Sequence, residues 1–153
     1  MYRQFCYDTA IGKVFIAERE GAVTHLTFSE KKLPAQMETG RSELLDTAYL
    51  QLNEYLEGNR REFEMPLAPK GTEFQRTVWR ALCEIPYGET RSYGEIARRI
   101  DNPKACRAVG LANNRNPISI IIPCHRVIGS DGRLVGYGGG LPLKEYLLTL
   151  EKG

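Results

Sequence analysis

The chain has 153 residues, of which 42 % are hydrophobic and 26 % are charged, and its formal net charge is +2. This length fits one domain or two small ones, and no apolar stretch is long enough to cross a membrane. The first residues lack the apolar core of a signal peptide, so we expect a cytoplasmic protein, in the cytosol or nucleoid.

The four cysteines, Cys6, Cys83, Cys106 and Cys124, form no Cys-x-x-Cys pair. With only two histidines beside them, the chain fits no common zinc pattern. We therefore expect reduced thiols, with no metal site and no cofactor.

Residues 1–70 predict a small β/α domain. Short strands are expected at 5–7, 13–17 and 22–28, the last because its apolar and polar residues alternate. Apolar residues at helical spacing predict a helix over 42–56, and an extended piece over 62–67 follows. Pro66, Pro69 and Gly71 mark a linker, so we place the domain boundary between 1–70 and 71–153.

Residues 71–153 predict a mostly helical domain. Thr72 can cap a helix that ends before Pro86. Ser92 and Glu95 have the spacing of a capping box, which predicts a second helix over 92–100.

A second part of this domain alternates helix, strand and loop. Asn102-Pro103 predicts a further helix over 103–113, and this helix with the preceding one resembles a helix-turn-helix. The apolar run 118–122 predicts a buried strand, and a glycine-rich loop occupies 136–140. A closing helix is expected over 142–151.

Positive charge is concentrated in the second half of the chain. Residues 1–70 carry 9 Lys/Arg and 11 Asp/Glu, whereas residues 71–153 carry 12 and 8. Within 91–126 two acidic residues oppose seven basic ones: Arg91, Arg98, Arg99, Lys104, Arg107, Arg115 and Arg126. Such a segment can hold a polyanion such as DNA, and a solvated helical face is the alternative.

The tetrapeptide Pro123-Cys124-His125-Arg126 is the most informative motif, because a thiol stands beside an imidazole at the end of the apolar run. A thiol becomes a strong nucleophile as thiolate, and neighbouring basic or cationic groups raise the thiolate fraction. The motif indicates either a reactive cysteine on a rigid support or a small buried cysteine at a strand end.

Several motifs together resemble the O6-alkylguanine-DNA alkyltransferases, also called methylated-DNA–protein-cysteine methyltransferases. Residues 122–128 resemble the family's signature around its acceptor cysteine, and residues 102–110 resemble its recognition helix. Asn116-Pro117, Tyr93 and residues 137–151 fall at the expected offsets. The resemblance implies an α+β fold, in which residues 1–70 form the variable, ribonuclease H-like N-terminal domain.

The resemblance implies direct repair of DNA by transfer of a methyl or larger alkyl group. The group would pass from O6 of guanine, with O4-alkylthymine as a further candidate substrate, to the thiolate of Cys124. The thioether product has no easy leaving group, so each molecule would act once.

The resemblance also implies roles for the residues around Cys124. Glu151 would orient His125, which would act on the thiol through a bridging water. Tyr93 would face the base, and Asn116 would tie the preceding loop to the cysteine turn. The sequence alone favours a solvated helix-end residue for Glu151, and a surface aromatic is the alternative for Tyr93.

A second group of residues would form the substrate pocket. Main-chain groups of Cys124 and Val127 would contact the guanine edge, and Tyr137 and Gly138 would close the pocket. Gly138 stands where some members have serine, so only a backbone N–H remains there. Lys144 matches a family position, with its role left open. We expect Arg126 to fix the fold through buried carboxylate or carbonyl partners, away from the substrate.

The implied partner is double-stranded DNA, bound by a monomer through the minor groove with the alkylated base flipped out. Arg107 would fill the space that the base leaves, and Lys104 would also contact the DNA. Ala105 and Ala108 would allow close approach to the DNA backbone. A solvent-facing helix arginine is the alternative for Arg107.

Three other functions remain open at this point. Alkyltransferase-like proteins bind alkylated DNA without an acceptor cysteine, but Cys124 is present here. A thiol hydrolase would need an oxyanion hole that nothing in the sequence indicates. A helix-turn-helix regulator would need a regulatory domain, for which the chain is too short.

Overall fold

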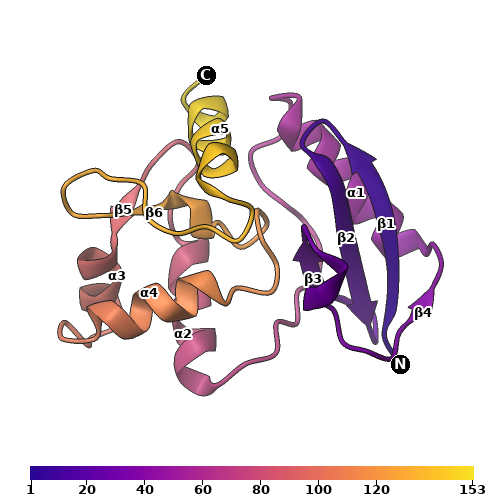
Figure 1. Ribbon diagram of the computed structural model, residues 1–153, viewed down its shortest axis with the longest axis horizontal. Helices are drawn as coiled ribbons and strands as arrows, with labels where there is room; N and C mark the ends of the chain where they lie inside the picture. Colours follow the sequence, from indigo (N-terminus) through magenta and orange to yellow (C-terminus); the bar gives the residue numbers. More distant parts are fainter. The chain divides into compact units, whose positions relative to one another are not determined.

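The computed structural model describes residues 1–153 and divides into two compact units, Met1–Pro69 and Lys70–Gly153. Figure 1 labels the helices and strands of both units. None of the helices is both long and apolar enough to cross a lipid bilayer.

The first unit contains a four-stranded sheet of order β3-β2-β1-β4. Strands β1 (Arg3–Thr9), β2 (Gly12–Arg19) and β3 (Ala22–Thr27) form an antiparallel meander, and β4 (Glu38–Thr39) pairs in parallel with β1. Val14 and Ile16 of β2 are both fully buried. Because they are two residues apart, they lie on the same face of the strand.

Helix α1 (Glu43–Leu56) contacts β1, β2 and β3 and covers this sheet (Figure 1). It begins where expected, because the Ser42 side chain accepts a hydrogen bond from the Leu45 amide. Its buried residues recur at helical spacing: Leu45, Ala48, Gln51, Leu52, Tyr55 and Leu56. The predicted β/α unit is confirmed, with longer first and second strands than the sequence indicated.

The segment between β3 and α1 contains structure that the sequence did not reveal. It holds a 3-10 turn, η1 (Glu30–Lys32), and the two-residue β4, which is too short to show any alternation. The extended piece expected over 62–67 is mostly irregular, and only Leu67 pairs with a strand residue, Val23.

The second unit is built from four helices around two short pairing segments. The helices are α2 (Glu73–Cys83), α3 (Tyr93–Arg99), α4 (Cys106–Asn114) and α5 (Leu141–Lys152). The pairing segments are β5 (Arg91–Ser92) and β6 (Val127–Ile128), which are parallel, and a 3-10 turn, η2 (Cys124–Arg126), precedes β6.

Local capping explains where α2 and α3 begin. Ser92 with Glu95 forms the capping box that their spacing predicts, and Thr72, expected as a cap, forms a second complete box with Gln75. Helix α4 packs against both α2 and α3 (Figure 1), and the buried Trp79 indole N–H of α2 donates to the Ala112 carbonyl at 2.9 Å. The mixed α+β fold with a helix-turn-helix is confirmed.

The predicted start of the recognition helix is wrong. Helix α4 begins at Cys106 and not at Pro103, because Asn102 to Ala105 form a turn in which the Ala105 amide donates to the Asn102 carbonyl at 2.9 Å. Proline favours the second position of such a turn as well as the first position of a helix, so the sequence signal was ambiguous. Lys104 and Ala105 therefore precede the helix.

The strand predicted over 118–122 is also wrong. The run folds into a tight turn, in which the Ile122 amide donates to the Ile118 carbonyl at 3.0 Å. Ile120 has φ of 71°, a left-handed conformation that is rare for β-branched residues. All of these residues are buried, so the run is apolar because it lies in the core and not because it pairs with a sheet.

Candidate active site

Cys124 is the first residue of the η2 turn and is only 4 % exposed. Its amide donates to the Ile122 carbonyl at 2.7 Å, and the Arg126 amide donates to the Pro123 carbonyl at 3.0 Å. The thiol is therefore presented by a tight turn and not by the end of a strand.

Two asparagines near the end of α4 hold this turn. The Asn116 amide donates to the Ile122 carbonyl at 2.8 Å, and its oxygen accepts from the Ile118 amide at 3.0 Å. The Asn113 amide reaches the Cys124 carbonyl at 3.4 Å. Sequence reasoning missed Asn113, although a polar residue beside Ala112 on the buried face of a helix is a detectable signal.

The Glu151 carboxylate, on α5, is the hub of the site. Its Oε2 lies 2.7 Å from His125 Nε2 and accepts from Arg126 Nη2 at 3.0 Å. Its Oε1 accepts from Arg126 Nε at 2.8 Å and from the Gly88 amide at 3.1 Å. The carboxylate thus binds the arginine with both oxygens, the strongest geometry for such a pair.

These contacts fix the state of His125, whose side chain is fully buried. A carboxylate only accepts hydrogen bonds, so His125 Nε2 carries the ring proton and Nδ1 holds the basic lone pair. Burial is the main cause that lowers the pKa of His125. The charges of Arg126 and Lys144 lower this pKa further, whereas the hydrogen bond to Glu151 and the charge of Glu151 raise it. His125 is therefore a neutral imidazole at neutral pH.

Arg126 fills the supporting role expected from its sequence position. Besides its two bonds to Glu151, its Nη1 donates to the Ile85 carbonyl at 2.7 Å. This arginine is 7 % exposed and links η2, α5 and the end of α2.

Tyr93 and Lys144 meet at Val135, immediately before the glycine-rich loop. The Tyr93 hydroxyl, on α3, donates to the Val135 carbonyl at 2.9 Å, and burial raises the pKa of this tyrosine. Lys144 Nζ, on α5, donates to the same carbonyl at 2.9 Å, and burial lowers the pKa of this lysine to about 8. The Tyr93 ring also lies against Gly110 of α4, whose Cβ would stand 3.8 Å away.

The other residues expected to line the pocket lie on β6 and on the loop before α5. Val127 is fully buried in β6, opposite Arg91. The Tyr137 ring makes an edge contact with His125, with 6.5 Å between the ring centroids. Gly138 lies in the turn before α5.

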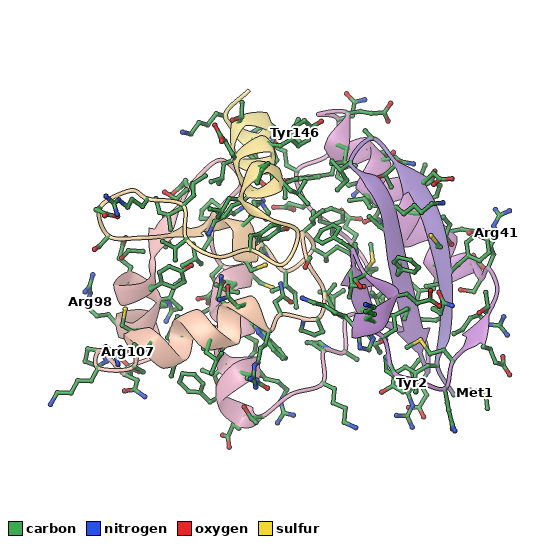
Figure 2. All side chains as sticks on the ribbon, viewed as in Figure 1. Met1, Tyr2, Arg41, Arg98, Arg107 and Tyr146 are labelled. Atoms are coloured by element: carbon green, nitrogen blue, oxygen red, sulfur yellow. The ribbon has the colours of Figure 1, made fainter.

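The expected DNA-contacting residues gather at the start of α4. Arg107, labelled in Figure 2, is exposed, as are Ala108 in the helix and Lys104 just before it, whereas Ala105 is half-buried. No group of three or more His, Cys, Asp or Glu side chains is arranged to hold a metal ion.

Comparison with known proteins matches both units to one family. Residues 73–153 match the "6-O-methylguanine DNA methyltransferase, DNA binding domain", and residues 1–69 match the ribonuclease-like domain of the same family. The chain belongs to the 6-O-methylguanine DNA methyltransferase family.

Curated relatives and solved structures agree with this assignment. A methylated-DNA–protein-cysteine methyltransferase of Methanosarcina acetivorans is 51 % identical over 148 residues, covering 95 % of each chain. That of Methanosarcina barkeri is 53 % identical over 149 residues, 95 % of this chain and 94 % of its own. The crystal structure of Mycobacterium tuberculosis OGT in complex with DNA has a TM-score of 0.92 and 48 % identity, covering 98 % of this chain and 92 % of that one.

Proposed function

We propose that this protein repairs DNA directly by moving an alkyl group from O6 of guanine, or O4 of thymine, to Cys124. Family membership and relatives that share about half of its residues support the reaction class. The observation that carries the assignment to Cys124 is the buried chain of contacts from Arg126 through Glu151 to His125, the residue next to that thiol.

The chemistry is a displacement at a saturated carbon. The Cys124 thiolate forms a bond to the alkyl carbon as the bond from that carbon to O6 breaks. Guanine leaves with the electron pair of that bond and takes up one proton. The product is a thioether, which lacks a leaving group, so the protein is consumed after one transfer.

His125 is the base that generates the thiolate. Its neutral imidazole takes the thiol proton at Nδ1, through a bridging water. Glu151 holds the required tautomer and compensates the imidazolium that forms. Arg126 anchors the carboxylate, because this arginine donates two hydrogen bonds to Glu151.

The alkylated base occupies a pocket beside the acceptor turn. Main-chain groups of Cys124 and Val127 contact the guanine edge, and the Tyr93 hydroxyl donates to N3 as negative charge develops on the leaving base. Tyr137 and Gly138 close the pocket, with the Gly138 amide facing O6. Asn116 keeps the acceptor turn rigid, which its two bonds at 2.8 and 3.0 Å support.

The base must leave the helical stack to reach the thiol. A cytoplasmic monomer would bind the minor groove with the exposed start of α4. Arg107 fills the vacated space, Lys104 contacts phosphate, and the small side chains of Ala105 and Ala108 allow close approach.

A turnover count tests this function. Protein is mixed with an excess of duplex DNA carrying O6-methylguanine, and the methyl groups removed per chain are counted at completion. We expect one, both for the natural chain and for Cys106→Ser, which removes an exposed thiol of the DNA-binding helix. More than one transfer per chain, or loss of transfer in Cys106→Ser, would contradict the proposal.

A further inference from the structure

One main-chain oxygen accepts hydrogen bonds from two different helices. The Val135 carbonyl is 2.9 Å from the Tyr93 hydroxyl of α3 and 2.9 Å from Lys144 Nζ of α5. Lys144 Nζ also lies 3.4 Å from the Gly136 carbonyl. Both side chains therefore hold the same point of the loop that joins β6 to α5.

This loop needs such support, because its own hydrogen bonds lie at its ends. Gly129 donates to the Arg133 carbonyl at 2.8 Å, and Gly140 donates to the Tyr137 carbonyl at 2.9 Å. Residues 134–136 between them make no hydrogen bonds to other main-chain groups. The middle of the loop is also closely fitted, since a Cβ on Gly136 would lie 3.0 Å from the Asn114 side-chain oxygen of α4.

Lys144 is an unusual residue for this task. Its side chain is fully buried, and none of the ion pairs in the structure gives it a carboxylate partner. The titratable groups that act on it electrostatically are Cys124 and His125 of η2, and Tyr93 shares its acceptor. Burying an ammonium without a counter-ion costs free energy, so its retention needs a reason other than stability.

We propose that Lys144 is a positioning residue that keeps the glycine-rich loop closed while Tyr93 transfers its hydrogen bond from the Val135 carbonyl to the bound alkylguanine. The inference rests on the proposed function, in which Tyr93 faces the base. A carbonyl oxygen has two lone pairs, so in the free protein both donors are accommodated. When Tyr93 turns to the base, Lys144 still satisfies the carbonyl, and Tyr137 and Gly138 stay in place around the substrate.

Loop motion in the DNA-free protein provides the first test. Backbone order parameters for residues 134–138 are measured by ¹⁵N relaxation in the natural chain and in Lys144→Met. We expect a fall from about 0.85 to below about 0.6 in the variant. Lys144→Gln, which keeps a donor without the charge, should restore most of the order, and Lys152→Met, at an exposed position of the same helix, should change nothing.

Single-turnover kinetics with free O6-methylguanine base provide the second test. Lys144→Met should raise the half-saturating base concentration about tenfold, equal to about 1.4 kcal/mol and comparable to a hydrogen bond from a charged donor, with little change in the maximal rate. Tyr93→Phe should reduce base binding less in the Lys144→Met background than in the natural chain. In that background the Tyr93 hydroxyl stays hydrogen-bonded to the Val135 carbonyl and contributes less to the base.

Two outcomes would overturn the proposal. Unchanged loop order in Lys144→Met would remove the positioning role, and this readout does not depend on alkyl transfer. The second outcome is a lower maximal rate in Lys144→Met, together with effects of Lys144→Met and Tyr93→Phe on transfer that are independent and therefore multiply. It would mean that Lys144 acts on the Cys124 thiolate instead.

Discussion

The Arg126–Glu151–His125 cluster makes a quantitative prediction for Glu151→Gln. Glutamine matches glutamate in size, but it removes the negative charge that pairs with the buried Arg126. Its amide N–H group would also face the N–H groups of Arg126 and His125, which are donors themselves. The Glu151 side chain is 1 % exposed and that of Arg126 is 9 % exposed, so water cannot replace the lost contacts. Removing one partner of a buried pair costs about 3–5 kcal/mol, a large share of the roughly 5–15 kcal/mol that stabilises a typical domain.

Urea unfolding measures this cost. With an m-value of about 2 kcal/mol/M, a loss of about 4 kcal/mol shifts the midpoint by about 2 M. Glu145→Gln, at an exposed position of the same helix, should change stability by less than about 0.5 kcal/mol. Adding Arg126→Met to Glu151→Gln should recover part of the loss, because no unpaired charge then remains.

The same substitution should slow alkyl transfer. Without the carboxylate, His125 loses the acceptor that fixes its tautomer and the charge that stabilises its protonated form. A Glu151→Gln variant that unfolds within about 1 kcal/mol of the natural chain would refute the buried ion pair, and an unchanged transfer rate would remove Glu151 from the reaction.

Three further predictions follow from particular residues. Arg107→Ala should slow transfer from duplex DNA much more than from free base, whereas Arg98→Ala, also exposed, should affect the two substrates alike; equal losses for Arg107→Ala would exclude a role in base extrusion. Stability should fall as the pH drops below about 6.5, because the unfolded state protonates His125 while the buried imidazole, with its lowered pKa, stays neutral; urea midpoints at pH 7.5 and 5.5 should show a smaller fall in His125→Gln. Ile120→Gly should destabilise by about 1–2 kcal/mol less than Ile118→Gly, since only Ile120 has positive φ and both are buried; equal losses by urea unfolding would contradict that strain.

The sequence predicted an element correctly where its signal lies within a few consecutive residues. The Thr72 cap and the Ser92 capping box placed two helices correctly, since the hydrogen bonds at each helix start form within four residues. The predicted start of the recognition helix was wrong because Asn102-Pro103 suits a turn and a helix start equally well.

The sequence did not show which residues far apart in the chain pair with one another. A run of buried isoleucines looks the same in a strand and in a core turn, so the fold around Ile120 could not be told from composition. The two-residue β5 and β6 are defined only by each other. Glu151 gave no local signal at all, since its partners are His125 and Arg126, more than 20 residues away.

Peptide mass spectrometry of the protein after reaction with O6-methylguanine DNA shows directly whether Cys124 accepts the alkyl group. We predict a single added methyl group on the peptide that contains Cys124, and no adduct in Cys124→Ser under the same conditions. A methyl group on Cys83 or Cys106, or demethylated DNA with no adduct on the protein, would contradict it.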